Sequence, residues 1–383
     1  MRSTDFTPES PGRLVEIPTG VQAFVPDPLP DELALDHVVI RLLTDAEHAI
    51  GRLVGAVGRT VNPFLVGSPL LHREAILSSR IEGTIATPEQ LVLAELAGPS
   101  ASGEDAGEAE EVVNYMRAMR HGLRSKLPIS LRLIREMHGV LMKGVRGGQD
   151  RPGEFRDVQN FIGSPGASIG DARFVPPPPG AMRECLDAFE RRLHPRDERL
   201  PLLVKLAVVH YQFEAIHPFR DGNGRIGRLL LPLMLVREKR LDEPVLFLSA
   251  YLERHRQQYM DLLLAVSQKG VWLEWLRFFL KGVEESASES LEQTDALLAL
   301  RQGYHDQFRV ARSFGVLQKL IDNLFVSPSI TMTTTAKTLK ITPAAASSNI
   351  RKLTEGGVLR EVTGRKRDQV FVAHEILRFM GKR

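Results

Sequence analysis

Apolar residues recur with the spacing of an α-helix up to about residue 300 of the chain. Because residues three and four apart lie on one face of a helix, this pattern indicates helices rather than strands. The sequence therefore predicts a mainly α-helical fold, and it contains no internal repeat. The expected helices cover residues 31–57, 69–81, 109–125, 129–144, 180–193, 200–216, 224–239, 251–268 and 271–284.

Three stretches interrupt the helical pattern. The first 30 residues contain six prolines, which predicts an extended arm, because proline fixes φ and lacks an N–H donor. Residues 98–111 are small, acidic and rich in turn formers, so we expect a surface loop or linker there. Residues 153–180 contain four consecutive prolines, and the Arg173–Val175 run before them predicts a short strand in a hairpin-like insertion.

Residues 307–383 follow a different pattern. We expect three helices and two short strands, at 307–325, 333–339, 342–355, 358–362 and 370–372. Three helices followed by a β-ribbon with a basic tip are the order of a winged helix-turn-helix. The sequence therefore predicts an arm and helical region at 1–108, a helical core at 109–285 and a C-terminal winged helix-turn-helix domain at 300–383.

The composition is that of an ordinary globular protein with two or three domains. Apolar residues make up 43% and charged residues 25% of the 383 residues. No apolar run approaches the roughly 20 residues needed to cross a bilayer, and the N-terminus lacks the pattern of a signal peptide. The single cysteine, Cys185, allows no intrachain disulfide. We therefore expect a cytoplasmic protein with no membrane partner.

Positive charge is concentrated at the C-terminal end. The net charge is only +3, yet residues 351–383 hold nine Lys and Arg against four Asp and Glu. If the winged helix binds DNA, phosphate contacts are expected at the end of the 342–355 helix and at the ribbon tip. The alternative is a protein-interaction or dimer module, and the small side chains of 343–348 favour no strong sequence specificity. The candidate contacts are Arg351, Lys352, Arg365, Lys366 and Arg367.

Residues 217–228, HPFRDGNGRIGR, contain a turn that suits phosphates. Gly222, Asn223 and Gly224 form a tight turn at the start of the 224–239 helix, where unpaired N–H groups and the helix dipole favour an anion. Arg225 and Arg228 lie three residues apart on one face of the first helical turn. Both guanidinium groups can therefore bind phosphate oxygens.

Two further side chains in this string add chemistry. Asp221 supplies a single carboxylate beside the phosphate site, which suits Mg²⁺ because this ion takes one or two carboxylates plus phosphates and water. His217, whose ordinary pKa is near ~6.5, can take a proton from an attacking hydroxyl. A histidine before a proline and an Asp-Gly-Asn-Gly turn are each common structural features. Their combination within one short string instead predicts a catalytic site.

This string matches every fixed position of His-x-Phe-x-Asp/Glu-Gly-Asn-Gly-Arg-x-x-Arg, the signature of the Fic family, which the chain resembles from about residue 110 to 270. The resemblance implies a Fic-type helical core with a short β-hairpin flap around 174–178 that docks the target. It also implies that His217 is the general base, that Phe219 packs into the core and that Asp221 holds Mg²⁺.

The same resemblance implies the activity of a protein adenylyltransferase. AMP would pass from ATP to a Ser, Thr or Tyr hydroxyl of a target protein, or of the chain itself. Gly222, Asn223 and Gly224 would hold the phosphates, with Arg225 and Arg228 on the polyphosphate. A homodimer is expected by analogy. Tyr251 lies at a plausible distance along the chain for an adenine contact, although an aromatic residue in an apolar helix equally fits the core.

Residues 78–83, SSRIEG, resemble the inhibitory pattern of the same family. Ser78 and Glu82 lie one helical turn apart, and Glu82 falls at a helix C-terminus, where the dipole disfavours a carboxylate unless a cation compensates. The resemblance implies that Glu82 pairs with Arg228 and opposes the γ-phosphate of ATP. The alternative is an exposed glutamate before a glycine C-cap. Relatives also use this glutamate to remove AMP, so both directions of catalysis stay open.

Two other functions are compatible with the sequence. The chain could be a DNA-binding transcriptional regulator whose core only senses nucleotide, or a Fic enzyme that uses UTP or another donor. A pure sensor could dispense with the base, so the intact His217, Asp221, Arg225 and Arg228 favour an enzyme. The motif binds phosphates and metal without reading the base, so the donor is not determined.

Overall fold

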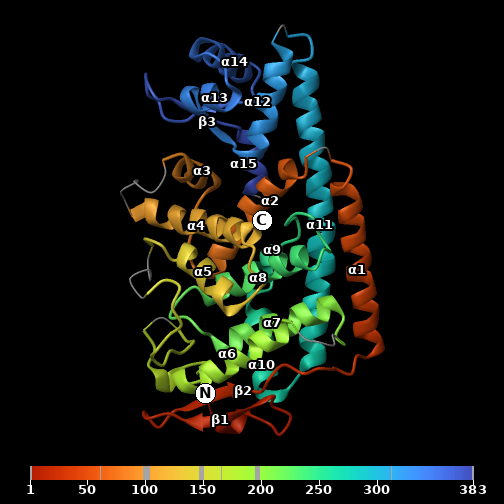
Figure 1. Cartoon of the computed structure of the whole chain (residues 1–383), viewed down its shortest axis with the longest axis vertical. Helices are drawn as coiled ribbons and strands as arrows, with labels where there is room; N and C mark the ends of the chain where they lie inside the picture. Colours follow the sequence, from red (N-terminus) through yellow and green to blue (C-terminus); the bar gives the residue numbers. More distant parts are fainter. Residues whose placement is uncertain are drawn as a thin grey trace. The chain divides into compact units, whose positions relative to one another are not determined.

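The computed structural model describes residues 2–60, 62–97, 104–145, 151–164, 166–194, 199–311 and 313–381. These residues form two compact units. Unit 1 comprises Met1–Ala49, Arg117–Arg240 and Leu248–Ser286, and unit 2 comprises Ile50–Met116, Leu241–Phe247 and Ala287–Arg383. Three of the five boundaries fall inside helices, which are α1 (His37–Val57), α4 (Glu104–Arg124) and α11 (Trp272–Gln307). Figure 1 labels these three helices. The mainly α-helical fold predicted from the sequence is confirmed.

The centre of unit 1 is a pair of buried helices, α7 (Leu202–Ile216) and α8 (Asn223–Arg237). Both are apolar on nearly all sides, as expected of helices that are covered by others. The covering elements include α5 (Leu131–Leu141), α6 (Pro179–Leu193) and α10 (Arg256–Lys269), and α9 (Ser249–Arg254) contacts α10. The loop between α7 and α8 consists of residues 217–222, of which Pro218, Phe219 and Gly222 are buried.

The N-terminal arm is a β-hairpin, which the proline content did not predict. Strands β1 (Gly12–Glu16) and β2 (Gln22–Pro26) pair antiparallel, with Gly12 opposite Pro26 and Glu16 opposite Gln22. Phe24 is fully buried, and its N–H donates to the carbonyl of Val175 at 2.8 Å. The chain is extended here as expected, but the pairing was not predicted; it is possible because the prolines flank or end the strands, where no ladder hydrogen bond is lost.

Several helix boundaries differ from those expected. Helix α1 begins at His37 rather than at residue 31, because the Asp36 carboxylate accepts from the N–H of Val39 at 2.9 Å and caps the helix. Helix α2 (Phe64–Ile81) begins before Pro69, which lies inside it. The helix expected at 251–268 is divided into α9 and α10 at His255.

Helices occupy two segments for which the sequence predicted none, one between domains and one loop. Helix α11 runs without a break through 285–305, where we expected the start of a separate domain. Helix α4 begins at Glu104, and an additional helix, α3 (Pro88–Ala97), precedes it. The prediction of a loop over 98–111 was therefore wrong for 104–111, while 98–103 lie outside the described residues. Acidic and small residues at the start of α4 favour turns locally, but packing of the later turns stabilises the helix.

The expected flap hairpin contains one antiparallel bridge. Ile162 and Phe174 exchange two backbone hydrogen bonds, of 2.8 and 3.1 Å, and the 3₁₀ turn Ile169–Asp171 lies between them. The run of prolines after Val175 cannot donate to a longer ladder. The segment is therefore a loop closed by one bridge rather than a paired strand.

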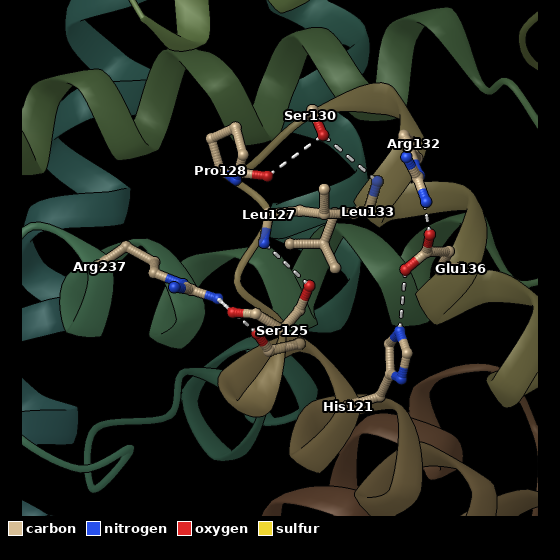
Figure 2. Close-up of polar contacts among 10 residues, drawn as sticks. His121, Ser125, Leu127, Pro128, Ser130, Arg132, Leu133, Glu136 and Arg237 are labelled. Atoms are coloured by element: carbon tan, nitrogen blue, oxygen red, sulfur yellow. Dashed lines mark hydrogen bonds and ion pairs between the residues drawn. The ribbon is translucent and has the colours of Figure 1, made fainter.

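The turn between α4 and α5 is fixed by side chains bound to backbone atoms (Figure 2). Arg237, from the end of α8, donates to the carbonyls of Gly122 and Ser125. Ser130 caps α5 by accepting from the N–H of Leu133 at 3.4 Å. These contacts satisfy carbonyls at the end of α4 and N–H groups at the start of α5, and so fix where α5 begins.

Unit 2 contains α2, α3 and the C-terminal elements. The latter are α12 (Phe314–Val326), β3 (Ser329–Thr331), α13 (Met332–Leu339), α14 (Pro343–Glu355), β4 (Arg360–Glu361), β5 (Val370–Val372) and α15 (His374–Met380). The strands form one antiparallel sheet in the order β3-β5-β4. The sequence predicted helices α12, α13 and α14 and strands β4 and β5, but it did not predict β3 or α15.

The C-terminal elements pack on α2 and α3. Helices α12 and α15 both contact α2. Ser68 of α2 donates to the carbonyl of Val326, and Ser329 of β3 donates to the carbonyl of Val92. Residues 313–381 are thus part of one compact unit with the α2 helix. Among the described residues, no helix is long and apolar enough to span a bilayer.

Candidate active site

His217 terminates α7 in a left-handed conformation, with φ of 49°. Such a conformation is costly for a residue other than glycine, and Pro218 disfavours the continuation of the helix. The Nδ1 atom lies 3.3 Å from the carbonyl oxygen of Glu214. Because a carbonyl only accepts, this contact places the proton on Nδ1 and the basic lone pair of the neutral ring on Nε2.

Asn223 closes the loop onto Phe219. Its Oδ1 accepts from the N–H of Phe219 and its Nδ2 donates to the carbonyl of the same residue, both at 2.8 Å. The Phe219 ring is fully buried and stacks on His138 at 3.7 Å between centroids, so the resemblance-based placement of this ring in the core is borne out. A phosphate contact by Asn223 would therefore come from its backbone N–H rather than from its carboxamide.

Asp221 projects from the loop with half of its side chain exposed. Its Oδ1 accepts from the N–H of Gly222 at 2.6 Å and lies 3.5 Å from Nη2 of Arg225. Gly222 has φ of 77°, and a Cβ there would come within 2.9 Å of the Met142 sulfur. Glycine is required at this position by both the backbone and the space, and this turn leaves the Asp221 carboxylate accessible to a ligand.

The first turn of α8 carries N–H groups and two buried cations. The first backbone bond of the helix joins the Ile226 N–H to the Gly222 carbonyl, so the N–H groups before Ile226 have no intrahelical acceptor. Arg225 and Arg228 are 3% and 2% exposed. Arginines at a helix N-terminus in a poorly solvated site suit a polyphosphate, and the phosphate role of this pair stays a prediction.

His138 holds the end of the loop and was not predicted as a site residue. Its Nδ1 accepts from the N–H of Gly153 at 2.9 Å, so its Nε2 carries the proton and donates to the carbonyl of Asp221 at 3.0 Å. Burial, together with the charge of Arg225, lowers the pKa of His138 to about 4. The ring is therefore neutral at pH 7. A histidine on the apolar face of the predicted 129–144 helix was the available signal.

His210, on α7, contacts the first turn of α8. Its ring lies 3.2 Å from the carbonyl of Gly227 through Nδ1 and 2.7 Å from the Tyr259 hydroxyl through Nε2. Burial, together with the charge of Arg228, lowers the pKa of His210 to about 3. The positive charge of Arg228 thus acts inside the core, close to the start of α8.

Tyr251 packs in the core of unit 1. Its ring lies 4.6 Å from His255 and 5.1 Å from Phe278, and a Cβ on Gly282 would come within 2.6 Å of it. Only 5% of Tyr251 is exposed, and burial raises the pKa of its hydroxyl to about 12. This packing favours the core alternative over the adenine contact, which stays a prediction.

The residues of the predicted inhibitory motif lie in unit 2. Ser78 is fully buried, α2 ends at Ile81, and Glu82 is its C-cap, followed by Gly83 at φ of 92°. The helix-end position expected for Glu82 is thus confirmed. Thr84 is buried and donates to the carboxylate of Glu111 at 2.7 Å. The pairing of Glu82 with Arg228, a residue of unit 1, stays a prediction.

The candidate nucleic-acid contacts differ in exposure. Arg351 is 73% exposed on α14 and lies 3.9 Å from Glu355. Lys352 is only partly exposed and donates to the hydroxyl of Ser313 at 2.8 Å, so its ammonium is engaged within unit 2 rather than directed at a ligand. The remaining three, Arg365, Lys366 and Arg367, are exposed in the loop between β4 and β5.

The fold and the loop define a class of helical protein in which a glycine turn suited to phosphates joins two buried helices. Residues 128–235 match the model of the Fic/DOC family, and residues 40–124 match the model of the Fic/DOC family N-terminal region. Together the two matches span just over half of the chain. The chain belongs to the Fic/DOC family.

Two curated relatives are named protein adenylyltransferase Fic. The protein of Drosophila grimshawi is 32% identical over 163 residues, which cover 41% of this chain and 31% of that protein. The protein of Aedes aegypti is 31% identical over 206 residues, which cover 52% of this chain and 37% of that protein. The chain therefore spans about a third of the length of these relatives.

A solved structure supports the fold. The crystal structure of a Fic family protein from Desulfovibrio desulfuricans G20 aligns with a TM-score of 0.57 at 19% identity. The alignment covers 89% of this chain and 97% of that one. A Fic domain containing signaling protein from Bacteroides thetaiotaomicron aligns with a TM-score of 0.52 at 16% identity, over 66% of this chain and 97% of that one.

Proposed function

We propose that the chain is a protein adenylyltransferase, which transfers AMP from ATP to a Ser, Thr or Tyr hydroxyl of a target protein or of itself. The observation that carries this proposal is the loop from His217 to Arg228. It presents a histidine with a basic Nε2 at one end and a helix N-terminus with two buried arginines at the other. The names of the relatives agree with this activity.

The residues of the loop would divide the reaction between them. His217 Nε2 takes the proton of the hydroxyl as its oxygen attacks the α-phosphorus of ATP. The bond between the α-phosphorus and the bridging oxygen breaks, and pyrophosphate leaves. The N–H groups at the start of α8, with Arg225 and Arg228, stabilise the negative charge that develops on the phosphates. Positioning and charge stabilisation supply most of the rate.

The site also fits Mg²⁺. Asp221 offers an exposed carboxylate next to the phosphate-binding turn, and an ion of this kind is commonly held by one or two carboxylates plus phosphates. No cluster of three or more His, Cys, Asp or Glu suited to a metal occurs in the described part of the chain, so the phosphates would supply further ligands. When bound, the ion would neutralise phosphate charge.

We propose that Glu82 inhibits this activity by pairing with Arg228. A carboxylate on that guanidinium would occupy its donors and repel the γ-phosphate. The C-cap position of Glu82 supports the proposal, because a carboxylate at a helix C-terminus is stabilised by a nearby cation.

Labelling with α-³²P-ATP and Mg²⁺ tests transfer and inhibition together. We expect Glu82→Gly to label itself or lysate proteins well above wild type, and Glu82→Gly/His217→Ala to lose the label. If no variant is labelled by ATP, the same assay with UTP, GTP and CTP separates another donor from no transfer. No label with any nucleotide would favour the nucleotide-sensing regulator. AMP removal is read by incubating a labelled target with wild type.

We further propose that residues 313–381 form a winged helix that contacts DNA phosphates. Support comes from the order α12, β3, α13, α14, β4 and β5, and from the exposed cations Arg351, Arg365, Lys366 and Arg367. Binding should weaken steeply with salt and show little sequence preference. A homodimer and a cytoplasmic location are proposed on the resemblance and the composition.

A further inference from the structure

Arg156 is a buried arginine that donates only to backbone carbonyls. Its side chain is among the largest that are fully buried in the chain, at 2% exposure. Among the described residues, no carboxylate pairs with its guanidinium. The four acceptors are the carbonyls of His217 at 2.9 Å, Pro177 at 2.6 Å, Val158 at 3.1 Å and Ile216 at 3.4 Å.

Such an arrangement lowers the stability of the fold, so its value lies in the geometry that it fixes. A buried charge without a counter-ion is unfavourable, and well-packed apolar side chains often replace buried ionic groups without loss of stability. Burial lowers the pKa of Arg156 to about 10, which still leaves it charged at pH 7. Carbonyl dipoles from three separate segments are thus held around one rigid, planar cation, which fixes their relative positions.

The residues around Arg156 fix the rest of the same loop. The N–H of Arg156 donates to the carbonyl of Pro218 at 2.9 Å. Asn160 Nδ2 donates to the carbonyl of Phe219 at 3.0 Å, and Asp157 accepts from Arg220 at 2.8 Å.

Asp221, near the end of the loop, is fixed from the same segment. The N–H of Gly153 orients His138, whose Nε2 donates to the carbonyl of Asp221. The segment 153–160 therefore contacts, directly or through one side chain, every residue from 217 to 221. Its contacts are mostly to backbone atoms, which set the path of the loop.

We propose that Arg156 is a positioning residue of the transfer site, because it fixes the backbone of His217 and the base of the flap at Pro177 in one arrangement. The base that takes the proton and the segment expected to hold the target would then be aligned by a single guanidinium. This inference rests on the proposed function. It requires that the loss of Arg156 affects turnover more than nucleotide binding.

Steady-state labelling in the full chain carrying Glu82→Gly tests this requirement. We expect Arg156→Gln and Arg156→Lys to lower kcat about 100-fold, because a small displacement of reacting groups has an effect of this size. The KM for ATP should change by less than about threefold, since the phosphate-binding residues remain. Lysine keeps the charge but cannot reach four carbonyls, so it should not restore turnover.

Arg237→Gln is the matched control. Arg237 also donates its guanidinium to backbone carbonyls, those of Gly122 and Ser125, but at the opposite end of α8 from the loop (Figure 2). We expect this variant to lower the melting temperature without lowering kcat. If the Arg156 variants lower only the melting temperature and keep kcat, the positioning role is wrong.

Chemical rescue gives a readout that a general loss of stability would not. Guanidinium ion, added to Arg156→Gly below the concentration that unfolds the chain, should restore part of kcat, while sodium chloride at the same ionic strength should not. An absence of rescue together with a KM effect as large as the kcat effect would overturn the proposal.

Hydrogen exchange tests the contacts of Arg156 with the loop and with Pro177 without an activity assay. We expect Arg156→Lys to speed exchange in peptides covering 216–222 and 174–178, and Arg237→Gln to leave both unchanged. Unchanged exchange in the Arg156 variants would overturn the positioning role. If exchange responds but Glu82→Gly labels nothing with any nucleotide, the proposed function fails while the structural link between loop and flap holds.

Discussion

Two regions of the molecule bury polar groups in different ways. In unit 1, the loop between α7 and α8 is held by side chains that bond to backbone atoms: Arg156, His138, Asn160 and Asn223. In unit 2, a run of buried polar side chains on helix α2 bonds to other side chains. The two arrangements constrain different things.

The run comprises His72, Arg73 and Glu74, each with a side-chain partner on another element of unit 2. His72 lies 2.7 Å from Glu95 of α3. Arg73 pairs with Glu289 of α11, and the Tyr115 hydroxyl of α4 donates to Glu74 at 2.8 Å. These pairs fix where the helix as a whole lies against its neighbours.

Contacts to backbone atoms fix the path of the chain itself, whichever side chains the loop carries. A catalytic loop needs its atoms held to within a fraction of an ångström, and backbone contacts provide this. Side-chain pairs instead couple one helix to several others. The helix with the predicted inhibitory motif is thus connected to α3, α4 and α11, so a displacement of any of these helices would also displace α2.

The largest effect on the free energy of unfolding is expected when the pH is lowered. The pKa of His138 is about 4 in the folded chain against about 6.5 when unfolded, so the folded state binds fewer protons and stability falls as the pH falls. From pH 7 to pH 4 the loss from this group is on the order of 3 kcal/mol. Urea unfolding of wild type and His138→Gln at several pH values measures it.

The control for this titration is Leu141→Ala, which removes a fully buried side chain on the same helix, α5. We expect it to lower stability by a similar amount at every pH, because no proton is involved. Equal pH dependence in wild type and His138→Gln would contradict the neutral, loop-holding histidine.

A smaller effect is expected from one side-chain pair of α2. Tyr115→Phe should cost about 2 kcal/mol, because it removes a hydrogen bond to a carboxylate. A double-mutant cycle with Glu74→Met should give a coupling of about 1–2 kcal/mol. Tyr304→Phe is the matched control, since the buried Tyr304 hydroxyl finds no partner among the described residues. Additive effects at 74 and 115 would contradict pairing as the main restraint on α2.

The smallest effect is expected at the surface. Arg360 of β4 lies 3.3 Å from Glu89 of α3, and the side chains are 62% and 42% exposed. Arg360→Gln should change stability by no more than about 0.5 kcal/mol and lose that effect at high salt. A change above about 1 kcal/mol, measured by urea unfolding, would contradict the view that the buried pairs, rather than exposed ones, hold the helices of unit 2 together.

The sequence predicted the parts whose signals are local. The ends of α7 and α8 lie within two residues of the predicted 200–216 and 224–239, because a proline and a glycine turn mark them. The C-cap position of Glu82 followed from the glycine after it.

The parts that were missed depend on contacts between distant residues. Nothing near Arg156 or His138 in the sequence marks the loop carbonyls they bind, those of His217 and Asp221, which lie about 60 and 80 residues away. The hairpin 12–26 was hidden because its prolines sit at strand ends. The buried polar run of His72, Arg73 and Glu74 reads as a helix surface until its partners are known.

The central claim is the transfer of AMP, and a comparison of α- and γ-labelled ATP tests it most directly. Full-length Glu82→Gly would be incubated with Mg²⁺ and each form, and protein-bound label compared. The account predicts that α-label stays on protein in a His217-dependent manner, while γ-label appears only in pyrophosphate. Retention of γ-label on protein, or release of both labels without any on protein, would contradict it.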